Sequence, residues 1–261
     1  MNPEKKDDIS LGLGQGAGMS FAVEDAGHPL KGRVICVDGP SASGKGTLAK
    51  NLARVFRLKF LDTGCLYRAV GWQLMQEGAA ETDVEAAVRV ATELAAPGHF
   101  DFRHKGNNVF GVWLGGREVT EDIRMLEVGM RANVVAQMMP LRLALRRFQQ
   151  EFARHWKGVY GVVLDGRDTG SKIAPDADLK LMMTGDPVVR AHWRLKDYLA
   201  AGKTVTLEQV VEELRVRDER DARNMEVFPD TVMVDVTATN AAGVLMLVFG
   251  VIEKKFGVKP L

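Results

Sequence analysis

The chain has 261 residues, and its 46% hydrophobic and 26% charged content is close to the average of soluble globular proteins. Its 35 Lys and Arg residues nearly balance 34 Asp and Glu residues, which gives a formal net charge of +1. This balance excludes a broadly basic nucleic-acid or membrane-surface protein and leaves room only for a local basic patch. The function has to be sought in local motifs.

Cysteine and histidine content indicates neither a disulfide framework nor a zinc site. Cys36 and Cys65 are the two cysteines, and the five histidines are scattered without the spacing of zinc ligands. The N-terminus lacks the apolar segment of a signal peptide. The longest apolar run, residues 241–252, is too short to cross a membrane and indicates a buried helix. We therefore expect a cytoplasmic protein.

Residues 1–31 are polar and glycine-rich, with no sustained hydrophobic period, which predicts a flexible N-terminal tail. Glycines at positions 12, 14, 16 and 18 superficially suggest a dinucleotide-binding fingerprint. That fingerprint requires a preceding strand and a further glycine at the place where Ala17 stands. The tail interpretation is therefore preferred.

The ordered chain is expected to begin at Arg33, and apolar runs then alternate with helical patterns. Short runs typical of buried strands lie at residues 34–37, 59–61, 160–164, 179–183 and 231–234. This alternation predicts an α/β fold, in which a parallel sheet of about five strands is flanked by helices. We expect one domain over residues 32–261.

Residues 99–119 break this rhythm, because their apolar residues alternate and turn signals lie at residues 105–108 and 115–116. Such a pattern is typical of a small antiparallel meander. We expect the meander to belong to an inserted subdomain that spans roughly residues 83–139.

A glycine-rich phosphate-binding loop follows the first predicted strand and opens the first predicted helix. Its nine residues are Gly39, Pro40, Ser41, Ala42, Ser43, Gly44, Lys45, Gly46 and Thr47. In such a loop, backbone N–H groups and a helix N-terminus surround phosphate oxygens, and the lysine adds a full positive charge. The loop predicts an ATP site, and because Gly46 moves the usual hydroxyl to Thr47, the pattern favours small-molecule kinases over GTPases.

The segment Asp62-Thr-Gly-Cys-Leu-Tyr-Arg68 follows the second predicted strand. Together with the loop, it resembles the bacterial cytidylate kinases of the nucleoside monophosphate kinase superfamily. The resemblance implies that Thr63, Tyr67 and Arg68 contact the sugar and phosphate of the nucleoside monophosphate. Taken alone, the segment equally allows Tyr67 to be a core residue and Arg68 a surface charge.

A second motif, Asp165-Gly-Arg-Asp-Thr-Gly170, closes the third predicted strand and is also similar to the family pattern. The similarity implies that Arg167 binds the acceptor phosphate and that Asp168 accepts a hydrogen bond from the cytosine amino group. Both pairings are chemically natural. The alternative is a salt-bridged turn, which would contribute about 0–1 kcal/mol if exposed.

The resemblance extends to the insert and to a lid expected at about residues 186–224. It implies base contacts from Asn133 and Arg142, although the family usually has Ser at the first position and Arg142 also fits a solvated helix face. In the lid, it implies that Arg217 and Asp221 contact phosphate and ribose. Two further arginines, Arg190 and Arg194, would flank or form this lid. The expected catalytic residues are Lys45, Arg167, Arg190, Arg194 and Arg217. The lid departs from the family at Asn224, where an arginine is usual, and in a shortened segment before residue 231.

The implied reaction is transfer of the ATP γ-phosphoryl group to CMP or dCMP. The resemblance implies Mg²⁺ with ATP. Its protein ligands are not assigned from the sequence, and the candidates are water-mediated contacts from Asp38 or Asp165 and the hydroxyl of Thr47. We expect a monomer with no nucleic-acid or membrane partner. The alternatives are another small-molecule kinase, for a different monophosphate or a shikimate-like acceptor, and a non-catalytic nucleotide-binding module.

Overall fold

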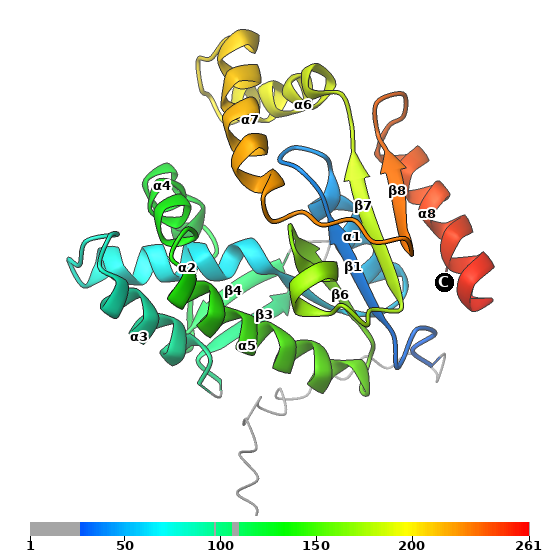
Figure 1. Ribbon diagram of the computed structural model, residues 1–261, viewed down its shortest axis with the longest axis horizontal. Helices are drawn as coiled ribbons and strands as arrows, with labels where there is room; N and C mark the ends of the chain where they lie inside the picture. The colour runs from blue at the N-terminus through cyan, green and yellow to red at the C-terminus, as the bar shows by residue number, and fades with distance from the viewer. Residues whose placement is uncertain (1–26, 97, 106–109, 261) are drawn as a thin grey trace, which may run out of the picture. The chain divides into compact units, whose positions relative to one another are not determined.

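The computed structural model describes residues 27–96, 98–105 and 110–260 (Figure 1). Contacts within the chain define two compact units. The insert unit is Cys65–Leu145, and the core unit is Ala26–Gly64 together with Arg146–Leu261. Within the described ranges, no helix has the length and apolar character needed to span a membrane.

The core unit contains the predicted parallel sheet, whose five strands are ordered β2-β6-β1-β7-β8. The strands are β1 (Val34–Asp38), β2 (Lys59–Asp62), β6 (Val162–Gly166), β7 (Leu179–Thr184) and β8 (Thr231–Asp235). Every residue of β1 and β6 is buried, because both strands are interior strands of the sheet. The predicted α/β fold with a five-stranded parallel sheet is therefore confirmed.

The register of the sheet places three acidic residues at one edge. Asp38, the last residue of β1, is paired with Gly166 of β6. Asp62, the last residue of β2, is paired with Asp165 of β6. Ligands of open parallel sheets bind outside this carboxyl edge, so the register itself locates the place for a site.

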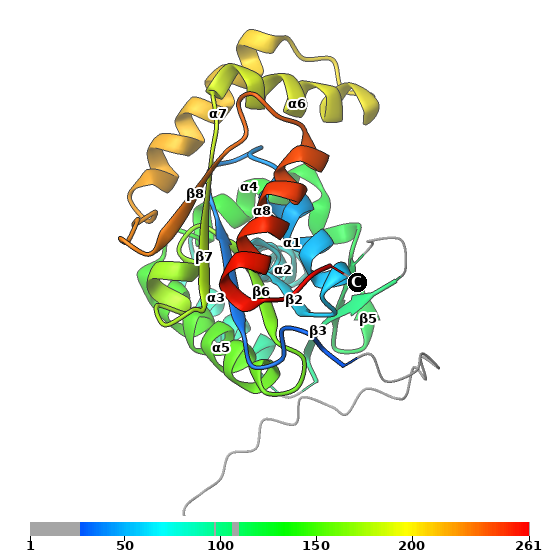
Figure 2. The same cartoon turned by 90° about the vertical axis from the view of Figure 1, so that its right-hand side faces the viewer.

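Helices of the core unit flank the sheet (Figure 2). Helices α1 (Lys45–Val55) and α8 (Ala241–Phe256) contact each other, and α6 (Pro187–Ala200) packs on α7 (Leu207–Ala222). Helix α7 begins with a capping box, in which Thr206 and Gln209 satisfy each other's backbone N–H groups. The contact between α6 and α7 buries Ala191, Val210 and Leu214.

The insert unit contains an antiparallel sheet and several helices. Its strands are β3 (Phe100–His104), β4 (Phe110–Leu114) and β5 (Arg117–Glu118). Its helical segments are α3 (Val84–Leu94), the short η1 (Asp122–Arg124) and α4 (Leu126–Val135), while α2 (Thr63–Gln76) and α5 (Met139–Lys157) each begin or end in the core unit. The predicted meander is confirmed. Gly115 and Gly116, both with positive φ, make its second turn, and the first predicted turn lies mostly outside the described residues.

The sequence predicts that the ordered chain begins at Arg33, but the structure also describes residues 27–32. Leu30 is 1% exposed, and its carbonyl lies against Gly161, where a Cβ atom would be 2.2 Å from that oxygen. Gly161 also has a φ of +82°, which glycine adopts at little cost. Burial of one leucine thus anchors the chain just ahead of β1, and residues 1–26 of the expected tail lie outside the described residues.

We expect Asp178→Asn to lower the free energy of unfolding at pH 7 by about 1–2 kcal/mol. Asp178 accepts hydrogen bonds from the Arg33 guanidinium at 2.8 Å and the Val34 amide at 2.9 Å. Burial opposes ionisation, but these bonds and nearby Lys157 outweigh it and hold the pKa of Asp178 below its ordinary value of 3.8. The stabilisation is therefore present above about pH 4 and is lost as pH falls through the folded-state pKa.

Urea unfolding between pH 2.5 and 7 measures this effect, with exposed Asp197→Asn on α6 as the matched control. The wild-type and Asp178→Asn curves are expected to converge in acid. Equal separation at every pH would show that the carboxylate charge contributes nothing.

Candidate active site

The phosphate-binding loop runs from the end of β1 to the first turn of α1. Gly39 has a φ of +152° and lies against β7, where a Cβ atom would be 2.7 Å from the Met183 carbonyl oxygen. Ala42 and Gly44 are both left-handed, with φ values of 58° and 79°. The two left-handed residues curve the chain so that α1 starts at Lys45. An anion at this helix N-terminus would face unpaired backbone N–H groups.

Lys45 and Asp165 form the charged centre of the loop. The Lys45 ammonium group donates to the Pro40 carbonyl at 3.2 Å. Burial, and secondarily Arg167, lowers the pKa of Lys45, while burial and the charge of Asp62 raise the pKa of Asp165. Each group therefore depends on opposite charge nearby to remain ionised.

Gly46 leaves room for the Asp165 carboxylate. A Cβ atom at Gly46 would be 3.0 Å from Asp165 Oδ2. The other carboxylate oxygen, Oδ1, is buried and has no hydrogen-bond partner in the part of the chain that the structure describes. The departure of this loop from the usual Lys-Ser/Thr ending thus coincides with a close approach of an acidic side chain to the start of α1.

Asp38 fastens the Asp165–Gly170 motif to the end of β1. Its Oδ1 accepts from the Thr169 backbone N–H at 3.0 Å and from the Thr169 hydroxyl at 2.9 Å, and its Oδ2 accepts from the Gly170 N–H at 2.8 Å. Thr63, the first residue of α2, donates from its hydroxyl to the Asp165 carbonyl at 2.8 Å. Asp38 is 5% exposed, and both its oxygens accept hydrogen bonds from backbone or hydroxyl groups, so it anchors this motif.

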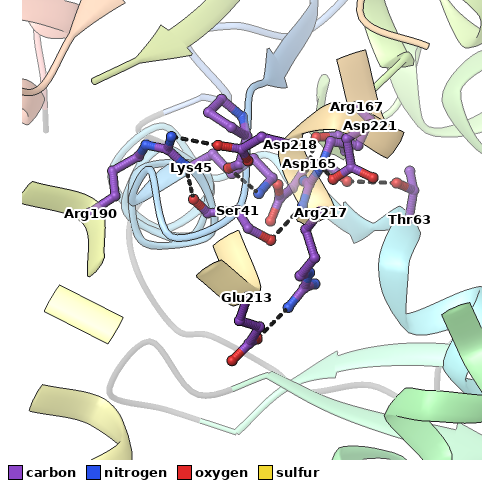
Figure 3. Close-up of polar contacts among 12 residues, drawn as sticks. Ser41, Lys45, Thr63, Asp165, Arg167, Arg190, Glu213, Arg217, Asp218 and Asp221 are labelled. Atoms are coloured by element: carbon purple, nitrogen blue, oxygen red, sulfur yellow. Dashed lines mark hydrogen bonds and ion pairs between the residues drawn. The ribbon is translucent and has the colours of Figure 1, made fainter. Parts of the chain in front are cut away.

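Arg167 links this motif to α7 and to the phosphate-binding loop (Figure 3). Its Nε donates to Asp221 Oδ2 at 2.6 Å, and its Nη2 donates to the Ser41 hydroxyl at 3.3 Å. Its Nη1 also donates to the Gly166 carbonyl at 3.1 Å. An incoming phosphate can replace the two side-chain partners. Arg167, the loop and Asp221 are therefore brought together, as the sequence analysis expects.

Arg190 of α6 is directed at protein acceptors. It is 3% exposed, and it donates to the Ser41 carbonyl at 2.8 Å, to the Gly185 carbonyl at 3.0 Å and to Asp218 Oδ2 at 2.5 Å (Figure 3). Sequence reasoning missed Asp218. The signal available was its spacing, because it lies three residues before Asp221 on the same helix.

The remaining lid arginines are less engaged. Arg217 donates to Glu213 at 3.4 Å, and burial together with the charge of Arg167 lowers its pKa. The guanidinium of Arg194 lies 4.5 Å from the centre of the Tyr198 ring. Helical spacing would allow Arg217 to pair with Asp221. Asp221 pairs instead with Arg167, which belongs to the Asp165–Gly170 motif.

The predicted acceptor contacts Tyr67, Arg68, Asn133 and Arg142 all belong to the insert unit. Arg68 on α2 donates to the Ile123 carbonyl at 3.0 Å, and Arg142 on α5 donates to the Ala136 carbonyl at 3.2 Å, near the end of α4. Asn133 is exposed on α4, and Tyr67 is half-buried. In the core unit, Asp168 is half-buried just before the π-helical turn η2 (Thr169–Ile173).

We expect Asp38→Asn to lower the free energy of unfolding by about 2 kcal/mol, since its amide NH₂ would face a backbone N–H donor. Chemical denaturation measures the change, with Asp38→Ala as the comparison, because alanine removes the acceptors without adding a donor. A change below about 0.5 kcal/mol for both variants would mean that the three hydrogen bonds do not hold the motif.

Comparison with known proteins agrees with this geometry. The family model described as "Cytidylate kinase" matches residues 35–254. Cytidylate kinase of Rhodospirillum rubrum is 36% identical over 227 residues, which cover 85% of this chain and 98% of the relative.

Two further relatives show the same relation. The cytidylate kinase of Rhodopseudomonas palustris strain BisB5 is 38% identical over 224 residues, 84% of this chain and 95% of the relative. The cytidylate kinase of Ralstonia nicotianae is 39% identical over 196 residues, which cover 75% of this chain and 79% of the relative. The match covers the phosphate-binding loop, the Asp165–Gly170 motif and both lid helices, and the chain belongs to the cytidylate kinase family.

Proposed function

We propose that the core-unit site transfers the γ-phosphoryl group of ATP to CMP and dCMP, with the donor on the phosphate-binding loop. The observation that carries this assignment is the convergence on Ser41: Arg167 contacts its hydroxyl, while Lys45 starts the helix that follows. This arrangement places a lysine and an arginine beside one loop of backbone N–H groups. Such a site favours a polyphosphate and the charge that develops during transfer.

On the donor side, the loop Gly39–Thr47 would hold the ATP phosphates. The Ser43 hydroxyl supports this assignment, because it is buried at 1% exposure and lacks a hydrogen-bond partner within the described residues. A buried polar group of this kind usually indicates a missing ligand or water. Lys45 would contribute the full positive charge, and an anionic ligand would favour its protonated form.

On the acceptor side, Arg167 would bind the CMP phosphate in place of Asp221. Released from the ion pair, Asp221 becomes available for the ribose, while Thr63, Tyr67 and Arg68 would contact sugar and phosphate. Base recognition would come from Asp168, Asn133 and Arg142. A general base is not required, because the attacking group is a phosphate with a second pKa near 6, largely anionic at neutral pH.

The residues present fit a Mg²⁺ ion bound with ATP. Asp165 offers a buried oxygen without a hydrogen-bond partner among the described residues, and Thr47 is exposed on the first turn of α1. We propose that these two residues hold the ion, which would neutralise phosphate charge. No cluster of three or more His, Cys, Asp or Glu side chains suited to a metal is found in the described chain, which agrees with an ion that the nucleotide helps to hold.

The lid helices α6 and α7 would close over the phosphates through Arg194 and Arg217. The Arg194 guanidinium lies over the Tyr198 ring, and Arg217 pairs with Glu213 at 3.4 Å. Both guanidinium groups would turn from these partners toward a bound anion. Monomeric action in the cytoplasm stays a prediction.

A phosphorylation assay across CMP, dCMP, UMP, AMP, GMP and dTMP tests the proposed reaction. We expect CMP and dCMP to be the best acceptors. If they are no better than the others, the substrate assignment is wrong, and no turnover with any acceptor would favour a non-catalytic nucleotide-binding module.

We expect Lys45→Ala to reduce turnover at least about 1,000-fold, because it removes the charge that neutralises the transferred phosphoryl group. Lys50→Ala on the same helix is the control for loss of a positive charge, and it should leave turnover near wild type. Full activity of Lys45→Ala would contradict the loop assignment.

We expect Arg167→Ala to raise the KM for CMP by about 10-fold or more, with a much smaller effect on the KM for ATP, since a charged hydrogen bond to the acceptor phosphate is lost. Steady-state kinetics with each substrate varied in turn measures the split. The reverse pattern, a large change for ATP alone, would refute this role.

A further inference from the structure

Ser41 accepts hydrogen bonds from two arginines, and each arginine also pairs with an acidic residue of α7. Its carbonyl accepts from Arg190, whose partner is Asp218, and its hydroxyl accepts from Arg167, whose partner is Asp221. Asp218 and Asp221 are three residues apart and therefore share one face of the helix. One helix face is thus connected twice to the middle of the phosphate-binding loop (Figure 3).

We propose that Arg190 and Asp218 are positioning residues that hold the phosphate-binding loop in its ATP-binding conformation. Neither residue would touch the nucleotide. The inference rests on the proposed ATP site and gives Arg190 a positioning role in place of the catalytic role expected from the sequence.

The hydrogen bonding of Arg190 argues against a phosphate contact. All three guanidinium nitrogens donate to protein: Nε to the Gly185 carbonyl, Nη1 to the Ser41 carbonyl and Nη2 to Asp218. The side chain is 3% exposed, so little of its surface is available to a ligand. Its charge is compensated by Asp218, which leaves little net attraction for ATP.

The position of the contact explains what it would control. Ser41 immediately precedes Ala42, a non-glycine residue with a left-handed φ of 58°. This conformation is strained for alanine, and it persists only where surrounding contacts enforce it. A buried guanidinium on the carbonyl of the preceding residue is such a contact. Loss of Arg190 would let the loop relax and turn its N–H groups away from the phosphates.

The same arrangement predicts whether removal of Asp218 strengthens or weakens ATP binding, and the direction of the change tests the proposal. A carboxylate near a polyphosphate repels it, so its removal would strengthen ATP binding if charge alone mattered. If Asp218 instead holds Arg190 on the loop, its removal weakens ATP binding. We expect Asp218→Ala to raise the ATP Kd about 10-fold, with Asp218→Asn intermediate because its amide oxygen still accepts one hydrogen bond.

Calorimetric titration of ATP, without acceptor, measures these affinities in the full chain. Glu219→Gln is the matched control, since Glu219 is the adjacent acidic residue and pairs with Arg215 on the exposed face of α7. Its ATP Kd should equal that of the wild type. Thermal unfolding of each variant shows whether it is folded at the titration temperature, and Asp218→Asn serves if the alanine variant is not.

A double-mutant cycle completes the test. Because both residues act through one contact, the Arg190→Ala/Asp218→Ala variant should bind ATP within about 2-fold of Arg190→Ala alone. Unchanged or tighter ATP binding by the folded Asp218 variants, or additive losses in the double variant, would overturn the proposal. A wild-type chain that does not bind ATP would instead refute the proposed function.

Discussion

Three carboxylates lie at the carboxyl ends of neighbouring parallel strands, and the structure of the site depends on how their charge is compensated. Asp38 and Asp62 are the last residues of β1 and β2, and the register of the sheet brings them level with the last two residues of β6, Asp165 and Gly166. Burial raises the pKa of Asp38 and of Asp165, so each needs donors or cations to stay ionised. Asp38 accepts three hydrogen bonds from the Asp165–Gly170 motif, and Lys45 lies beside Asp165. The groups that compensate the acids are those that a phosphoryl-transfer enzyme requires.

Helix α7 extends this compensation to the lid. Asp218 and Asp221 of α7 pair with Arg190 and Arg167, and both arginines donate to Ser41. Hydrogen bonds therefore link α7, the Asp165–Gly170 motif and the phosphate-binding loop. The segment after α7 is held by the ion pairs Lys172–Glu226 at 2.8 Å and Lys180–Asp230 at 3.0 Å. Lys180 also lies over the Phe228 ring. These contacts hold the end of α7 near the sheet.

Much of the fold was predictable because its signals are local. Short apolar runs indicated the buried strands, and alternating apolar residues indicated the meander. The phosphate-binding loop was recognisable as a motif between a strand and a helix. The long-range partners were not predictable, since nothing near Arg190 in the sequence indicates that its acceptors are Ser41, 149 residues away, and Asp218. The hydrogen bonds of Asp38 were not predictable for the same reason, since only the fold brings Thr169 and Gly170 to its oxygens.

The central claim is that Arg167 exchanges a protein carboxylate for the acceptor phosphate within a loop that is already formed. A crystal structure with CMP and a non-hydrolysable ATP analogue tests it most directly. The account predicts that Arg167 leaves Asp221 and contacts the CMP phosphate, while the Ser41 carbonyl remains bonded to Arg190. Arg167 still paired with Asp221, with the CMP phosphate bound elsewhere, would contradict it.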